Sequence, residues 1–216
     1  MTAVTGNNFE GDLPTAESNS ARRQQILQAA VTVISGSGYD KCTIREITDT
    51  AGVSRQAFYE VFEDKHSVLV SVLTKTSEDL LVYVRAATAP EEDWPTSLDA
   101  GLRAMLQFFA DNPDLARITF VEAQIAGPIA MGHVHKAMRI YRDCLFPKPK
   151  AKIDFRRNSD NVVDQILGAV YFTIYGAMSS QENISLTDLS PQLMEIVLLA
   201  QMTPKEVETQ LSSYRA

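Results

Sequence analysis

The hydrophobic residues of this chain recur every three or four positions over long stretches, and short polar stretches rich in Gly, Pro, Ser and Asn separate them. Spacings near 3.6 are typical of helices with one buried face, and no stretch alternates with a period of two over a useful length. From Ala21, one such stripe runs through Ile26 and Ile34. Gly36 and Gly38 end it. The pattern therefore predicts an all-α protein.

The same spacing predicts further helices along the rest of the chain. Pro90 and Pro95 bracket an expected loop that contains Trp94. Residues 1–19 are polar and acidic, which is typical of a tail outside the fold, and the polar segment 147–161 is expected to be a connector. The further helices are expected at about 44–51, 55–62, 65–87, 96–110, 113–125, 128–145, 160–180 and 191–202.

Capping residues mark the starts of the three helices between positions 43 and 87. Thr43 is followed three positions later by Glu46, which is the pattern of a capping box. Ser54 and Asp64 are N-cap residues for the next two helices. Gly52 tolerates a positive φ and so permits a tight turn after the first of them. Two short helices joined by a turn are expected here.

Neither short helix reaches the ~12–15 residues that an isolated helix needs in water. Packing on the preceding helix would supply the missing stability, because each buried apolar side chain contributes ~1.5–3 kcal/mol. The expected result is a helix-turn-helix, whose second helix can enter a major groove. The side chains available for this packing are Ile44, Ile47, Ala51, Val53, Phe58 and Phe62.

Several polar side chains around this motif are not needed for its core. Hydroxyl, guanidinium and amide groups are suited to phosphates and base edges, and helix starts attract anions. These features favour binding to double-stranded DNA. The side chains are Ser54, Arg55, Gln56 and Tyr59 on the second helix, Thr43 and Arg45 on the first, and Lys65 and His66 at the start of the next.

The segment from Arg22 to Leu73 resembles the N-terminal domain of the tetracycline-repressor (TetR) family. The elements that match, in order, are ILQAA, GY, TIREI, AGVS, FY, the Phe of VF, and the Lys that opens the next helix. The resemblance covers about a quarter of the chain. It implies a helix-turn-helix domain at 20–66 and a larger helical domain for ligand binding and dimerisation at 67–216.

The resemblance also implies which residues contact bases or phosphates. The family often has a small residue where this chain has Gln56, and a basic residue or His near Glu60 and Val61. Glu60 at the edge of a groove would repel phosphate or accept a hydrogen bond from cytosine, although a solvated surface charge is the simpler interpretation. The implied contacts are Thr43, Arg45, Ser54, Arg55, Gln56, Ala57, Tyr59 and Lys65.

In the larger domain, aromatic, Met and polar residues on the middle helices are candidates for a small-molecule pocket. Apolar walls with a few polar groups are typical of such sites, although the same pattern also describes an ordinary core. Glu122 and Gln124 are the strongest polar candidates, because they interrupt an apolar run. The candidate ligand-binding residues are Trp94, Met105, Phe109, Phe120, Glu122, Gln124, Tyr141, Tyr171 and Tyr175.

The helices at about 160–180 and 191–202 are candidates for a dimer interface. Paired with their twins, they would form a four-helix bundle around a two-fold axis. The small residues Gly168, Ala169, Gly176 and Ala177 would allow close approach, and the alternative is that both helices are internal core. The candidate interface residues are Val163, Leu167, Val170, Ile174, Leu193, Val197 and Ala200.

Charge and composition limit these interpretations. The net charge of −7 argues against a generally basic surface, and residues 20–66 carry six basic and six acidic side chains, so DNA contacts must come from a few placed groups. Two cysteines far apart, no apolar leader and no membrane-length apolar run indicate a cytoplasmic protein. His133 and His135 lack a third ligand at matching spacing, so no metal or other cofactor is expected.

The sequence thus predicts a ligand-responsive transcriptional regulator, most simply a repressor, that binds palindromic operator DNA as a homodimer. A small apolar or amphipathic effector would release it. The alternative is a helical small-molecule-binding or protein-docking module without specific DNA binding. The sequence contains none of the motifs that would indicate an enzyme: it has no Ser/His/Asp order, no Gly-rich phosphate loop and no paired metal ligands. No recognisable motif identifies the effector or the operator. No motif distinguishes one dimer from a pair of dimers on DNA.

Overall fold

The computed structural model describes residues 16–89, 93–145, 160–180, 184–199, 205–207 and 212. Every regular element within these ranges is helical, which confirms the prediction of an all-α fold. In chain order the elements are α1 (Ala16–Ser37), α2 (Ile44–Ala51), α3 (Arg55–Tyr59), α4 (Lys65–Thr88), α5 (Trp94–Asp111), α6 (Pro113–Arg117), the π-helical η1 (Ile118–Glu122), α7 (Ala123–Ala126), α8 (Pro128–Leu145), α9 (Asp160–Ser179), the 3₁₀-helical η2 (Leu186–Leu189) and α10 (Ser190–Leu199).

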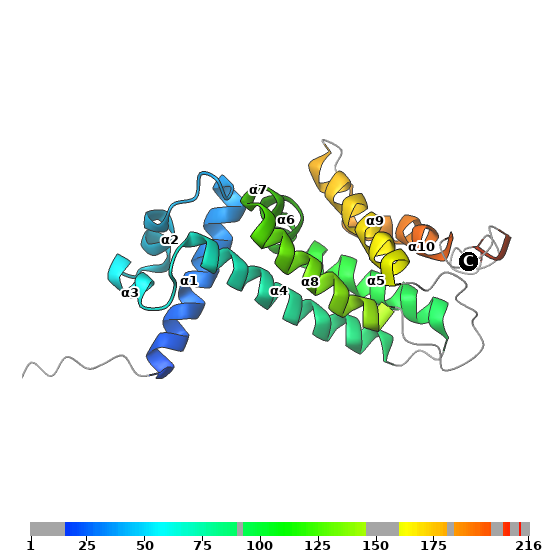
Figure 1. Cartoon of the computed structure of the whole chain (residues 1–216), viewed down its shortest axis with the longest axis horizontal. Helices are drawn as coiled ribbons and strands as arrows, with labels where there is room; N and C mark the ends of the chain where they lie inside the picture. The colour runs from blue at the N-terminus through cyan, green and yellow to red at the C-terminus, as the bar shows by residue number, and fades with distance from the viewer. Residues whose placement is uncertain are drawn as a thin grey trace, which may run out of the picture.

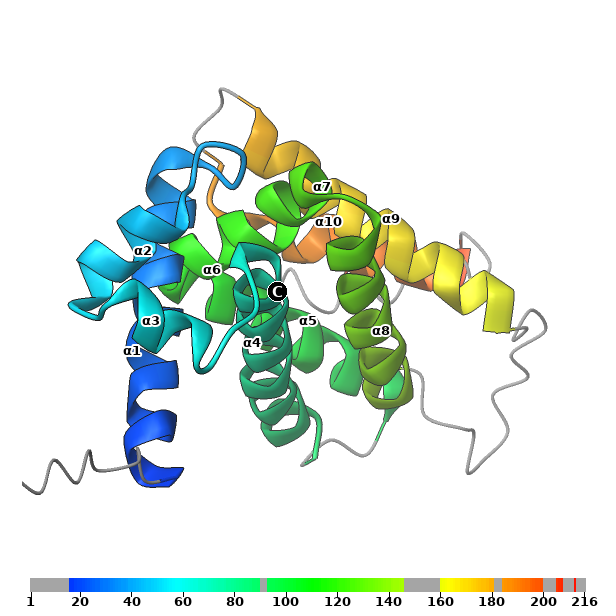
Figure 2. The ribbon, with the colours of Figure 1, turned by 60° about the vertical axis from the view of Figure 1, so that its left-hand side comes forward.

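The helices form two groups joined by α4. Helices α1, α2 and α3 lie together at one end of the molecule, and α4 leads from them along the second group (Figure 1). There α4 packs against α5 and α8, while α9 and α10 pack against each other and against the second group from another side (Figure 2). Helix α1 also contacts α6 and η1, so the first group rests on the second at two places besides α4.

The first group has a small core of its own. Ile26 and Ile34 of α1 are fully buried, as are Ile47 of α2 and Phe58 of α3. Phe62 packs its ring 5.9 Å from that of Phe58. These contacts give α2 and α3, which are only 8 and 5 residues long, the stability that helices of this length lack in isolation.

The structure corrects two expected helix starts. Helix α1 begins at Ala16, within the segment predicted as tail, because its first turns are polar and carry no apolar stripe that would reveal them. Trp94 is the first residue of α5 and is buried, whereas the sequence placed it in a loop. Asp93 caps this helix by accepting from the Thr96 amide, and Pro95 fits the first turn, where its missing N–H is not needed.

The helix expected at 113–125 is divided into α6, η1 and α7. Within it, the Ala123 amide donates to the Ile118 carbonyl five residues back, which is the hydrogen bond of a π-helix. Helix α10 ends at Leu199, and residues 200–204 lie outside the described residues, as do positions 147–159 of the predicted connector 147–161, whose last two residues begin α9. None of the helices in the described ranges is long and apolar enough to cross a membrane.

Candidate functional site

The turn between α2 and α3 is built by local hydrogen bonds. The Thr43 hydroxyl accepts from the Glu46 amide at 3.2 Å, and the Glu46 carboxylate accepts from the Thr43 amide at 2.9 Å, so the predicted capping box is confirmed. The hydroxyl and amide of Thr43 both donate to this carboxylate, and they lower the pKa of Glu46. Gly52 has a φ of 68°, and the Ser54 hydroxyl accepts from the Ala57 amide at 3.1 Å. These bonds fix the angle at which α3 leaves α2.

The outer surface of α2 and α3, which we call the reading face, carries the predicted DNA-binding side chains. Phe58 points into the core, whereas Tyr59 beside it is half exposed. The Arg45 side chain is 83% exposed, with its guanidinium 3.5 Å from the Asp49 carboxylate. Ala57 is partly buried. The exposed residues of the reading face are Thr43, Arg45, Ser54, Arg55, Gln56 and Tyr59.

Lys65 differs from this set, because it is partly buried and its ammonium group is hydrogen-bonded within the chain. It donates to the backbone carbonyls of Tyr39 at 2.9 Å and Cys42 at 3.1 Å. It also lies 4.4 Å from the centre of the Tyr39 ring. Lys65 therefore ties the start of α4 to the turn between α1 and α2. This geometry does not support the predicted phosphate contact, since the ammonium already has three partners within the chain.

Two arginines of α1 that the sequence analysis did not single out fix the far end of α3. Arg22 forms an ion pair with Glu60. The sequence predicted a solvated surface charge at Glu60, whereas the structure pairs this carboxylate. Arg23 donates to the Val61 carbonyl at 3.1 Å and lies 4.3 Å from the centre of the Phe62 ring. Arg22 neutralises the acid that would otherwise repel phosphate at the edge of the reading face.

A largely apolar cavity lies in the second group of helices, between α4, α5, η1, α8 and α9. Its volume is about 70 Å³. The rings of Phe109, Phe120 and Tyr171 form a continuous wall, with centroids 4.9 and 5.1 Å apart. Its apolar lining suits an aliphatic or aromatic group.

A few polar groups interrupt the cavity wall. The Tyr171 hydroxyl donates to the Thr119 carbonyl at 3.1 Å or the Phe120 carbonyl at 3.2 Å, and burial is the main cause that raises the pKa of Tyr171 to about 12. The Tyr141 hydroxyl donates to the Ser77 carbonyl at 2.8 Å. The buried Thr119 hydroxyl has no hydrogen-bond partner among the described residues, so it is available to a polar atom of a ligand.

The predicted pocket residues divide into two sets. Five of them line this cavity: Met105, Phe109, Phe120, Tyr141 and Tyr171. The other four, Trp94, Glu122, Gln124 and Tyr175, lie outside its wall. Helical periodicity does not reveal which of two aromatic residues faces a cavity and which faces a neighbouring helix. The wall also includes residues that sequence reasoning did not propose for it, namely Leu73, Thr76, Ser77, Leu80, Thr119, Val134, Ala137 and Met138.

Glu122 and Gln124 have other partners. Glu122 is fully buried, accepts from the Tyr39 amide at 2.8 Å and pairs with Arg117 at 3.1 Å. Gln124 donates to the Phe120 carbonyl at 2.7 Å. The two polar residues that seemed the best ligand contacts are therefore structural groups beside the cavity.

The predicted interface residues on α9 and α10 require a correction. Six of them are buried within the chain itself, because they are the inner face of these helices, and Leu167, Val170 and Ile174 line the cavity. Ala200 lies outside the described residues. The outer face of each helix carries other side chains than those predicted for the interface. The six buried residues are Val163, Leu167, Val170, Ile174, Leu193 and Val197.

Comparisons with known proteins match a family over the helix-turn-helix region. Residues 26–72 match the family model described as "Bacterial regulatory proteins, tetR family". FasR of Mycolicibacterium smegmatis, a helix-turn-helix transcriptional activator, is 30% identical over 141 residues, which are 65% of this chain and 63% of that protein. The regulator YvdT of Bacillus subtilis is 32% identical over 80 residues, covering 37% and 41%. The matched regions thus span less than two thirds of these two relatives.

Solved structures share the fold over a longer region. The fatty acid degradation regulator FadR of Bacillus halodurans has a TM-score of 0.71 at 22% identity, covering 85% of this chain and 96% of that one. FadR of Bacillus subtilis, solved in complex with stearoyl-CoA, has a TM-score of 0.66 at 20% identity, covering 82% and 97%. The order of the helices, the exposed helix-turn-helix and the sequence match agree: residues 26–72 match the tetR family of bacterial regulatory proteins, and the chain shares the fold of solved regulators of that family.

Proposed function

We propose that this protein is a homodimeric, ligand-responsive transcriptional repressor that binds operator DNA through its two reading faces and is released when an effector enters its cavity. The observation that carries the proposal is the exposed, capped α3 held out from a compact three-helix core. Arg55, Gln56 and Tyr59 are exposed on a helix short enough to fit within a major groove. Arginine suits guanine and glutamine suits adenine, while Thr43 and Ser54 lie at helix starts that attract phosphate.

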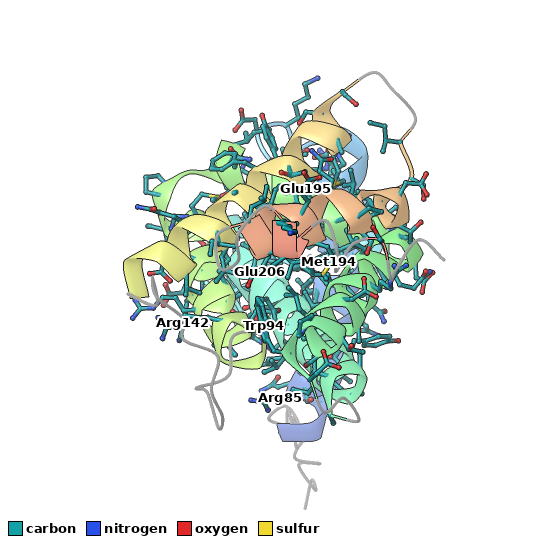
Figure 3. All side chains as sticks on the ribbon, turned by 90° about the vertical axis from the view of Figure 1, so that its right-hand side faces the viewer. Arg85, Trp94, Arg142, Met194, Glu195 and Glu206 are labelled. Atoms are coloured by element: carbon teal, nitrogen blue, oxygen red, sulfur yellow. The ribbon has the colours of Figure 1, made fainter. Side chains whose placement is uncertain are left out.

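A dimer gives this small face sufficient affinity and specificity. A single motif with a few phosphate contacts binds weakly at physiological salt, whereas two joined motifs bind half-sites about 34–36 Å apart. The outer side of α9 supports pairing with a second copy, because Phe172 is 60% exposed and the small residues Ala169 and Gly176 lie on the same stripe. Helices α9 and α10 form the face turned toward the viewer in Figure 3, where Glu195 of α10 is labelled. We propose this outer face as the dimer interface.

The apolar wall of the cavity supports an effector with an aliphatic chain. Its wall is apolar apart from a few hydroxyl groups and His133, so it favours hydrocarbon over a charged group. A FadR of the same fold was solved with stearoyl-CoA, and an acyl chain of this kind is the effector class that we propose here. Arg139 and His135 line an adjoining hollow between α8 and α9, together with the cavity residues Met138, Leu167 and Tyr171. The Arg139 guanidinium would suit the anionic head of such a ligand, and His135 could add a hydrogen bond.

DNA binding is tested by titrating the protein onto fragments from upstream of its own gene and measuring fluorescence anisotropy. We expect saturable binding to a palindromic fragment, and we expect the double variant Arg55→Ala, Tyr59→Ala to weaken it at least about tenfold, since each good base contact contributes ~1–3 kcal/mol. Arg103→Ala on α5 is the matched control, because this arginine pairs with Asp99 away from the reading face. Equal binding by both variants, or no saturable binding, would refute the proposal in favour of a docking or carrier module.

Effector binding is tested separately with stearoyl-CoA and stearate as probes. We expect either probe to raise the unfolding temperature and to lower operator affinity, because a ligand that prefers one conformation shifts both equilibria. A tenfold loss of DNA affinity requires only ~1.4 kcal/mol of differential binding. Failure of both probes to change the unfolding temperature would remove the acyl-chain assignment and leave the DNA result unaffected.

A further inference from the structure

We propose that the π-helical segment η1 transmits the state of the cavity to the helix-turn-helix, and that Glu122 is the positioning residue that makes this connection. The inference rests on the proposed regulator function for its biological meaning. Segment η1 is five residues long and contacts both the cavity and the turn between α1 and α2. Thr119 and Phe120 line the cavity, and Glu122 holds the turn between α1 and α2.

On the cavity side, η1 presents both a side chain and its backbone. Phe120 packs its ring 4.9 Å from that of Phe109 and 5.1 Å from that of Tyr171. The Tyr171 hydroxyl donates to the Thr119 or Phe120 carbonyl, and the Thr119 hydroxyl has no partner among the described residues. A molecule that fills the cavity therefore contacts η1 through Thr119 and Phe120.

On the other side, Glu122 is a fully buried carboxylate with one partner for each oxygen. Its Oε2 accepts from the Tyr39 amide at 2.8 Å, and its Oε1 accepts from Arg117 Nε at 3.1 Å. A buried charge is costly unless all its bonds are satisfied, so the position of Glu122 and that of the turn are tied together. Gly38 has a φ of 86°, a left-handed backbone conformation that glycine adopts without strain, so this turn can present the Tyr39 amide to Glu122.

The turn that Glu122 holds is itself bonded to the start of α4. The Tyr39 carbonyl accepts from Lys65 Nζ at 2.9 Å, and the Tyr39 hydroxyl is 3.1 Å from His66 Nδ1. A displacement of Glu122 thus acts on Tyr39, and through it on the first turn of α4 and the base of the helix-turn-helix. The contact joins positions 83 residues apart in the sequence, so it is a direct bond between the two groups of helices.

The π-helical form gives η1 a second arrangement to move into. Its i→i+5 bond from the Ala123 amide to the Ile118 carbonyl inserts one residue more per turn than an α-helix contains. A return to i→i+4 bonding would rotate the side chains at one end of the segment relative to the other. Pressure on Phe120 can therefore change the direction in which Glu122 points without unfolding the helix.

The test uses the free protein and needs neither DNA nor a natural effector. Ala137 of α8 lines the cavity opposite η1, so Ala137→Phe fills part of the cavity permanently. Hydrogen exchange of the backbone amides in residues 38–62 is measured with and without this filling. We expect a change of at least about fivefold in exchange rates in the wild-type background, the lower end of usual coupling between sites. Ala137→Leu serves if the phenylalanine variant does not fold.

The same filling is then repeated in Glu122→Gln. A glutamine side chain can accept from only one of the two donors, because its NH₂ group faces the other. We expect the effect of filling to fall below about twofold in this background and to persist in the control Glu195→Gln, an exposed acid on α10. An undiminished effect in Glu122→Gln, or no effect in the wild type, would overturn the inference. Loss of DNA or acyl-chain binding would not alter these rates, so the two failures are distinguishable.

Discussion

The salt dependence of the proposed operator binding follows from the cations that are exposed on the reading face. Arg45 and Arg55 are exposed there, whereas Arg22, Arg23 and Lys65 are held by contacts within the chain. The proposed dimer would thus offer four arginines to phosphates and bases. Each neutralised phosphate releases counterions and lowers the slope of log K against log salt by about 0.9, so we expect a slope of about −3.6.

This slope corresponds to a loss of roughly 150-fold in affinity between 50 and 200 mM salt. Arg45→Ala removes one cation from each protomer, so the slope should become about −1.8 and the loss about 12-fold over the same range. Fluorescence anisotropy titrations of one operator fragment at four salt concentrations measure both values. Because the result is a slope, it does not depend on knowing the absolute affinity beforehand.

Lys65→Met is the informative comparison for this reasoning. Its ammonium group donates to the Tyr39 and Cys42 carbonyls, so we expect the slope to stay within about 0.5 of the wild-type value, although the protein should become less stable. A slope near −1.8 for Lys65→Met, or a wild-type slope steeper than about −6, would mean that the internally bonded cations turn outward on DNA. Either result would refute the assignment of these side chains to structural roles.

Three further predictions concern the turn, the dimer and the cavity. Gly52→Ala should destabilise the protein by about 1–2 kcal/mol in urea unfolding, because its φ of 68° is left-handed, whereas Gly36→Ala within α1 should stabilise it by about 0.5–1 kcal/mol; equal effects would contradict this. Phe172→Glu should yield monomers in sedimentation analysis, and Tyr83→Glu, which is comparably exposed on α4, should not. The pKa of Tyr171 is raised from 10.0 to about 12, so the folded state binds this proton more tightly than the unfolded chain does. The stability it provides is complete below about pH 10 and is lost as the pH rises toward 12, and Tyr171→Phe should lack this loss in unfolding measurements across that range.

Much of the reading face could be predicted because its determinants are local. The capping box of Thr43 and Glu46, the turn at Gly52 and the cap at Ser54 each involve residues within a few positions of one another, and all are present as expected. The boundaries of α4 and α8 were also close to the prediction, since long periodic stripes define them. The start of α1 was not, because its first turns lie outside any apolar stripe.

The ligand and interface residues were predicted less well, for a physical reason. An apolar side chain at helical spacing looks the same whether it faces a cavity, a neighbouring helix or a second copy. Only packing distinguished Phe120, in the cavity wall, from Trp94, in the core, and turned Val163 inward while Phe172 faced outward. Periodicity identifies a buried face but not what covers it.

The sequence by itself determined that this chain is helical, where most helices start and stop, and that a capped helix-turn-helix lies near its N-terminus. Local hydrogen bonds and hydrophobic periodicity act over a few residues, so they can be predicted from the sequence. Tertiary structure alone decided which cations remain free, which apolar residues enclose the cavity, and that Glu122 meets Tyr39. Those contacts join distant positions, and they exist only once the helices have packed.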